Sequence, residues 1–193
     1  MPEDGFTDAG IPVAERGNPL HGRGVSATTQ VFAPAERVWQ VVSDIDAPGR
    51  FCKEAAGATW ETDDPRGVGS TFRGRNATDD TGHPSINAAL IAAMGKLEWE
   101  TPCTVTTWEP GRAFEYGVGE PGNPWALWGY LIEPAESGVA LTHYFLHGPA
   151  PSGVSMVAGA NEAEAEEIVA GRFRCIHNNL IQVVEGVKRE AES

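Results

Sequence analysis

The 193-residue sequence predicts an α+β fold, in which a curved antiparallel sheet of about seven strands wraps around one long C-terminal helix. Three observations predict it. The middle of the chain alternates apolar and polar residues in short stretches separated by Gly- and Pro-rich turns, which is typical of hairpin-connected strands. A strand and short helices precede these strands. Finally, residues 161–192 carry one helical stripe of apolar side chains, at Val169, Phe173, Ile176, Leu180, Val183 or Val184, and Val187.

The C-terminal helix has recognisable ends. Asn161 is the predicted N-cap, and Glu164 stands where a capping-box acid would. Lys188 and Arg189 complement the negative end of the helix dipole. Gly171 is the weakest helix former, so a bend is expected there. A helix this long and one-sided needs a broad cover, which the sheet provides; the alternative is a coiled-coil seam with a partner chain.

Composition limits the function. The formal net charge of -13 argues against nucleic-acid partners and against an anionic membrane surface. No apolar run approaches the roughly 20 residues of a membrane span, so no membrane insertion is expected. The three cysteines are widely spaced and odd in number, which indicates free thiols and a cytoplasmic protein. The expected state is a monomer or a homodimer.

The N-terminal residues 1–24 are rich in Pro, Gly, Asp and Glu and show no periodicity. This pattern predicts a flexible arm that is dispensable for the fold and is not a signal peptide. Residues 25–193 form the predicted ligand-binding domain. Pro34 begins a helix that runs to Asp44, and a second short helix is expected over residues 51–56. The predicted strands are residues 25–33, 58–62, 68–77, 99–108, 112–118, 125–133 and 139–147, and residues 148–160 are expected to be a loop.

One segment, residues 78–97, interrupts the meander. Ser85 can cap a helix of about ten residues whose Ala-rich sequence ends before Gly95. Two interpretations are open: a lid over a cavity mouth, or a surface helix that covers a sheet edge. If the helix is a lid, Ile86, Leu90 and Met94 face the cavity together.

The alternation along each strand selects the side chains that face inward. They are mostly aromatic and aliphatic, which is the usual lining of a pocket for a small apolar ligand. The alternative is that the same side chains simply fill a core. The candidate ligand-binding residues are Phe72, Asn76, Leu90, Met94, Trp99, Cys103, Val105, Phe114, Tyr116, Trp128, Tyr130, His143, Phe145, Phe173, Ile176 and Leu180.

His143 is the best candidate for proton transfer, because histidine titrates near neutral pH. Its alternative role is that of a hydrogen-bonded core residue. His147 lies four residues further along the same strand, roughly 13 Å away at ~3.3 Å per residue, so the two cannot share a metal. His177, on the helix side away from the apolar stripe, is a poor third ligand, so no metal site is predicted. No cofactor is expected. Glu54 and Asn76 are further polar groups that can face a ligand.

Several segments of the sequence resemble those of one known superfamily. Residues 25–44, VSATTQVFAPAERVWQVVSD, look like that family's opening strand and helix. Residues 71–76 resemble its third strand, and residues 103–116 resemble its fourth and fifth strands around a Glu-Pro-Gly turn. Residues 125–143 resemble its last hairpin. The superfamily that these segments resemble is that of the START-like proteins (SRPBCC superfamily), the polyketide cyclase/dehydrase and lipid-transport group. The resemblance extends from Val25 to about Ala191, and it implies a helix-grip fold with a cavity between sheet and helix.

Three functions are open at this point. The first is binding of a small hydrophobic molecule, such as a lipid, polyketide or aromatic metabolite, in an internal cavity. The second, implied by the resemblance, is an enzyme similar to polyketide cyclases, aromatases or dehydratases, in which His143, Tyr116 or Tyr130 assists proton transfer. The third is an acidic protein-interaction module with a filled interior and no ligand.

Overall fold

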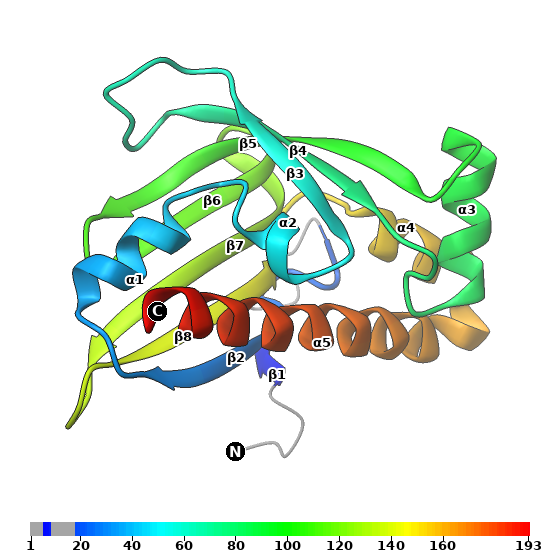
Figure 1. Ribbon diagram of the computed structural model, residues 1–193. Coiled ribbons are helices and arrows are strands. Elements are labelled where there is room, and N and C mark those ends of the chain that lie inside the picture. Colours follow the sequence, from blue (N-terminus) through cyan, green and yellow to red (C-terminus); the bar gives the residue numbers. More distant parts are fainter. Residues whose placement is uncertain (1–5, 9–17) are drawn as a thin grey trace.

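The structure is a computed structural model that describes residues 6–8 and 18–193. Its strands form one antiparallel sheet in the order β1-β2-β8-β7-β6-β5-β4-β3, which curves around the long helix α5 (Figure 1). The predicted α+β helix-grip fold is confirmed. The strands are β1 (Phe6–Asp8), β2 (Arg23–Val31), β3 (Ala55–Trp60), β4 (Thr71–Ala77), β5 (Glu98–Glu109), β6 (Ala113–Glu120), β7 (Asn123–Pro134) and β8 (Val139–His147). The helices are α1 (Ala35–Val42), α2 (Pro48–Phe51), α3 (Pro84–Met94), α4 (Gly153–Ala160) and α5 (Ala165–Ala191).

Helix α5 buries the predicted apolar stripe, including Phe173, Ile176 and Leu180, against the concave face of the sheet. Its start differs from the prediction. Asn161 is not its N-cap but ends α4, where its side-chain amide donates to the Val157 carbonyl at 2.8 Å. A 3-10 turn, Glu162–Glu164, then leads into α5. Residues 148–160 were predicted to be a loop, but residues 153–160 form α4. This helix is stabilised by a capping box between Ser152 and Ser155.

Gly171 has a packing role. A Cβ atom at this position would lie 2.4 Å from the carbonyl oxygen of Gly82, in the segment that precedes α3. Helix α5 runs without interruption through Gly171. A glycine is needed here because the backbone of the α3 segment approaches the helix closely.

The segment between β4 and β5 forms the predicted helix, now α3, and Gly95 ends it in the left-handed conformation with φ of 75°. His83, rather than Ser85, is the N-cap, since its Nδ1 accepts a hydrogen bond from the Ser85 N–H at 3.2 Å. The expected short helix over residues 51–56 lies earlier in the chain, as α2, because Pro48 favours a first helical turn.

Only parts of the predicted N-terminal arm are described; residues 1–5 and 9–17 lie outside the described residues. The parts that are described contact the sheet. Strand β1 pairs with residues 23–25 of β2. Asn18 is fully buried, and its amide donates to the carbonyls of Gly148 and Ala150 at 3.2 and 3.0 Å. The described part of residues 1–24 is therefore docked, which differs from the flexible arm expected. Within the described ranges, no helix has the length and apolarity needed to cross a bilayer.

Candidate functional site

The space between the sheet and α5 is filled at the end covered by α1. There the Trp39 and Trp108 rings meet edge to face at 5.1 Å, and both contact Phe114 in the same manner. Such perpendicular contacts are favourable between aromatic rings and leave little space. At this end, the inward side chains pack against one another as a core.

Toward α3 and α4 the same space opens into a cavity of about 720 Å³. The change from packed core to cavity occurs between neighbouring inward-facing residues of the same strand or helix. On β6, Phe114 is packed in the core, whereas Tyr116 and Val118 line the cavity. On α5, Val187 is packed whereas Val183 lines the cavity. A space of this size fits a drug-sized molecule.

Most of the candidate residues from the sequence line this cavity: Phe72, Asn76, Leu90, Trp99, Cys103, Tyr116, Trp128, His143, Phe145, Ile176 and Leu180. Val105, Phe114, Tyr130 and Phe173 do not line it, and all four are buried in the core.

Met94 is 52% exposed and does not line the cavity either. Helix α3 instead turns Ile86, Ala89, Leu90 and Ala93 inward. Side chains on one side of an α-helix recur on average every 3.6 residues, as positions 86, 89, 90 and 93 do. A constant spacing of four residues, which was expected for positions 86, 90 and 94, turns progressively away from that side.

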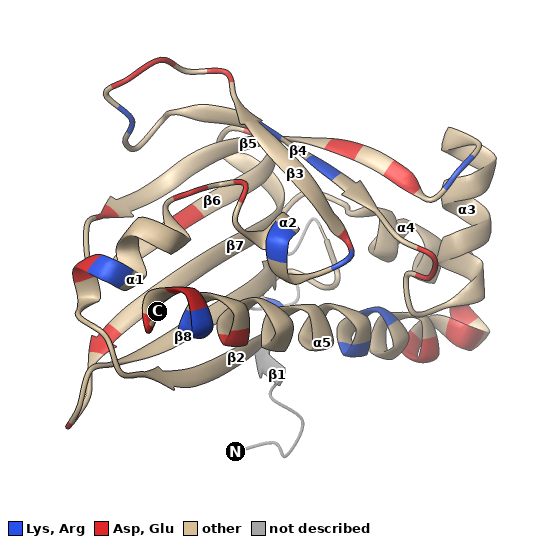
Figure 2. Ribbon diagram, viewed as in Figure 1, with Lys and Arg blue, Asp and Glu red and all other residues tan. Residues whose placement is uncertain are grey.

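Helices α3 and α4 lie side by side at one end of the molecule and carry no Lys, Arg, Asp or Glu (Figure 2). Alanine, valine and leucine side chains from both helices line the cavity there, including Ala89, Leu90, Val154 and Val157. The contribution of α4 was not predicted, because residues 148–160 were expected to be a loop. This end of the cavity is therefore formed by two uncharged helices.

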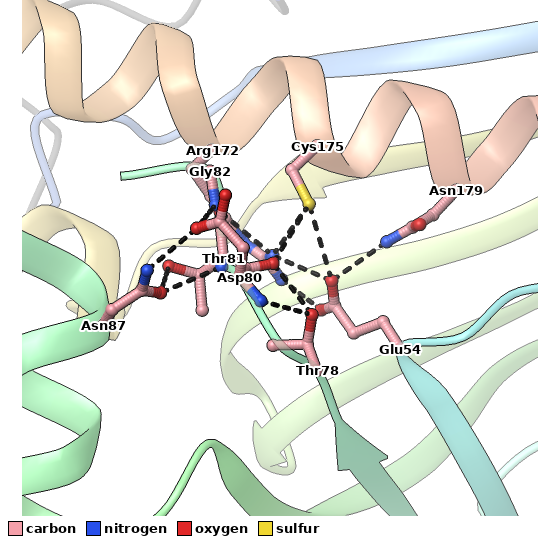
Figure 3. Close-up of polar contacts among 9 residues, drawn as sticks. All are labelled: Glu54, Thr78, Asp80, Thr81, Gly82, Asn87, Arg172, Cys175 and Asn179. Carbon is pink, nitrogen blue, oxygen red and sulfur yellow. Dashed lines mark hydrogen bonds and ion pairs between the residues drawn. The ribbon is translucent and has the colours of Figure 1, made fainter. Parts of the chain in front are cut away.

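Glu54 and Arg172, which line the cavity, form a buried ion pair that is drawn in Figure 3. Glu54, next to β3, accepts from both terminal nitrogens of Arg172 on α5, with Nη1 to Oε2 at 2.9 Å. Asn179, two turns further along α5, donates to the same Oε2 at 2.9 Å. Burial alone would lower the pKa of Arg172, but the charge and hydrogen bonds of Glu54 outweigh it, so this pKa is raised. Sequence reasoning pointed to Glu54 but missed Arg172, whose partner is distant in sequence.

The segment leading into α3 is joined to this ion pair (Figure 3). The Arg172 Nη1 donates to the Thr81 carbonyl at 3.5 Å, and the Thr81 N–H and hydroxyl both donate to Asn87 Oδ1, at 2.9 and 2.6 Å. The Asn87 amide in turn donates to Asp80 at 2.8 Å, and this bond, followed by one from the Gly82 N–H, lowers the Asp80 pKa. These contacts fix the first turn of α3 against α5.

His143 lines the cavity and stacks on Tyr130 at 4.0 Å. Its Nδ1 lies 2.9 Å from the Gly129 carbonyl, so Nδ1 carries the proton and Nε2 is the acceptor. Burial lowers the pKa of His143 to about 4. Near neutral pH its imidazole is uncharged and only weakly basic.

Three further titratable side chains that line the cavity, those of His147, Cys103 and Tyr116, are neutral as well. Burial lowers the pKa of His147 to about 3, raises that of the Cys103 thiol to about 11, and raises that of Tyr116 well above its ordinary value. Deep inside the cavity, the charges are those of Glu54 and Arg172, which compensate each other. The site thus combines an apolar, aromatic lining with one paired polar position.

Comparisons with known proteins agree with this architecture. Residues 23–185 match the model of the family described as polyketide cyclase / dehydrase and lipid transport. The solution structure of a Polyketide_cyc-like protein from Corynebacterium glutamicum is 28% identical, with a TM-score of 0.53 over 86% of this chain and 93% of that one. No curated protein matches the sequence.

Two crystal structures of di-domain ARO/CYC proteins share the fold at low identity. StfQ, from the steffimycin biosynthetic pathway, has a TM-score of 0.62 at 12% identity over 88% of this chain. BexL, from the BE-7585A pathway, has a TM-score of 0.60 at 15% identity over 88% of this chain. The match spans 50% of each di-domain chain. With its family match over most of its length, the chain belongs to the polyketide cyclase / dehydrase and lipid transport family.

Proposed function

We propose that the protein binds a small hydrophobic molecule, a lipid, polyketide or aromatic metabolite, between its sheet and α5. The observation that carries this proposal is the cavity of about 720 Å³, whose walls are mostly aromatic and aliphatic. A packed protein interior has few voids larger than a water molecule, so an apolar space of this size is a feature to be explained. The family, which includes lipid-transport proteins, supports the same function.

A second candidate function is catalysis similar to that of polyketide cyclases or aromatases. Two observations favour it: His143 and Tyr116 line the same cavity, and the fold is shared with ARO/CYC proteins. The low pKa of His143, about 4, opposes it, because an efficient general base has a pKa near the working pH. Binding is therefore the stronger of the two proposals.

The proposal includes a cytoplasmic location and a monomeric or homodimeric state. Cys52, Cys103 and Cys175 are free thiols in the structure, which fits a reducing compartment. The net charge of -13 opposes binding to nucleic acids.

Helix α3 provides a direct test. Replacing Leu90, which lines the cavity, with aspartate should weaken binding of the neutral probe N-phenyl-1-naphthylamine by about tenfold or more, about 1.4 kcal/mol. The reason is that a carboxylate would have to be desolvated against the bound probe. Probe fluorescence and the quenching of tryptophan emission would be titrated together.

The matched control is Ile91→Asp. Ile91 is the next residue of the same helix, is 49% exposed and does not line the cavity, so its replacement should leave probe affinity unchanged. Equal losses in both variants, or none in either, would show that α3 does not contact the ligand and only covers the sheet edge.

A further inference from the structure

The charges around the cavity fall into two groups. Arg75 and Glu100 are exposed and face each other across β4 and β5, where water screens them. Glu54 and Arg172 are each only 8% exposed and line the interior of the cavity. A ligand inside the cavity therefore meets this buried pair as its main electrostatic environment.

The pair retains hydrogen-bonding capacity. Glu54 Oε1 accepts from Arg172 Nη2, and within the described part of the chain no other donor reaches that oxygen. A carboxylate oxygen can accept two hydrogen bonds. The amide oxygen of Asn179, whose nitrogen donates to Glu54, also has no donor there. Two acceptors are thus available beside an apolar cavity, and an O–H group is the complementary donor.

The charge balance of the pair also favours a neutral hydroxyl group over an anionic group. Glu54 neutralises Arg172, so the buried position has no net charge. A ligand carboxylate would add one buried negative charge without a counter-ion, which costs several kcal/mol in a desolvated site. A neutral hydroxyl group does not carry this cost.

We infer that the Glu54–Arg172 pair is a specificity-determining position that admits neutral apolar ligands with a hydroxyl donor and rejects carboxylates. This inference rests on the proposed binding function, and it defines the ligand class: a hydroxylated aromatic or lipid alcohol, rather than a free fatty or aromatic acid. Arg172, although a cation inside the cavity, is held by Glu54 and is not an anion receptor.

The first experiment uses the unmodified protein and three ligands of matched shape, measured by calorimetry at neutral pH. 2-Naphthol should bind most tightly. 2-Methoxynaphthalene, which lacks the donor, should bind about fivefold more weakly, the effect of one hydrogen bond. 2-Naphthoate, which is ionised at this pH, should bind at least about tenfold more weakly than 2-naphthol.

Two variants then give the buried position net charges of opposite sign. Glu54→Gln exposes the Arg172 cation, so the affinity for 2-naphthoate relative to 2-naphthol should rise by about tenfold or more. Arg172→Gln exposes the Glu54 anion, so the same ratio should fall. Because both variants break the same pair and lose stability, binding is measured at low temperature, after circular dichroism has shown that each is folded.

Shifts of opposite sign in the affinity for 2-naphthoate relative to 2-naphthol support the inference. Structural damage alone would shift this ratio in the same direction in both variants. Equal binding of the three ligands to the unmodified protein would overturn it, even if neither variant folds. Identical losses for all ligands in both variants would overturn it as well. If N-phenyl-1-naphthylamine and all three ligands fail to bind the unmodified protein, the proposed binding function itself is wrong.

Discussion

Replacing Arg172 with methionine is expected to lower the free energy of unfolding by about 3–5 kcal/mol. The substitution keeps much of the side-chain volume but leaves the Glu54 carboxylate, 8% exposed, without its cation. It also removes the Arg172 hydrogen bond to the Thr81 carbonyl, so the segment leading into α3 should loosen together with the pair. Urea denaturation at neutral pH measures the loss.

Arg174→Met is the matched control for this prediction. Arg174 lies two residues further along α5 and is exposed, so its replacement should change stability by no more than about 0.5 kcal/mol. A similarly small change for Arg172→Met would mean that the ion pair contributes little to the fold. In that case, the description of Glu54 and Arg172 as a buried, mutually dependent pair would be wrong.

The protein is also expected to lose stability steeply as the pH falls below about 6.5, the ordinary pKa of histidine. His143 and His147 have pKa values lowered by burial to about 4 and about 3. Below pH 6.5 the unfolded chain binds protons at both positions, whereas the folded chain does not. The stability they contribute is thus complete above pH 6.5 and is lost as the pH falls toward 4, at up to about 1.4 kcal/mol per pH unit for each histidine.

The variant His143→Phe isolates one of these contributions. At pH 7 it should be less stable, because the Gly129 carbonyl loses its donor. As the pH falls to 4.5, the difference in the free energy of unfolding between the variant and the unmodified protein should shrink. The reason is that the unfolded variant binds about one proton fewer than the unfolded unmodified protein. Urea denaturation across this pH range provides the comparison. Parallel stability curves would show that His143 is protonated equally in the folded and unfolded states.

Much of the fold could be predicted from the sequence because its signals are local. The apolar stripe of α5, the alternation along β8 and the helix before Gly95 each depend on a short pattern that the structure reproduces. Helix α4 was missed because glycines obscure a short helix whose main signal is the Ser152 capping box. The docking of Asn18 was missed because its partners lie about 130 residues away.

The candidate site was predictable in part for the same reason. Strand alternation identifies which face a side chain occupies, so Tyr116, Trp128 and His143 were found. It does not say how far along the strand the core is packed, and Phe114, one pleat away from Tyr116, was therefore included as well. Arg172 was missed because its burial depends on an ion pair with Glu54. The two residues are 118 positions apart in the sequence, and only the tertiary fold brings them together.

A methyl NMR titration of the unmodified protein with 2-naphthol tests directly whether a ligand binds inside the cavity. If the ligand occupies the cavity, the methyl signals of Ile86, Ile176 and Leu180, which line it, should shift saturably with one binding constant. The methyl signals of Val68 and Ile181, which are 70% and 43% exposed and do not line the cavity, should stay in place. Shifts confined to Val68 and Ile181, or no saturable shifts at all, would contradict ligand binding in the cavity.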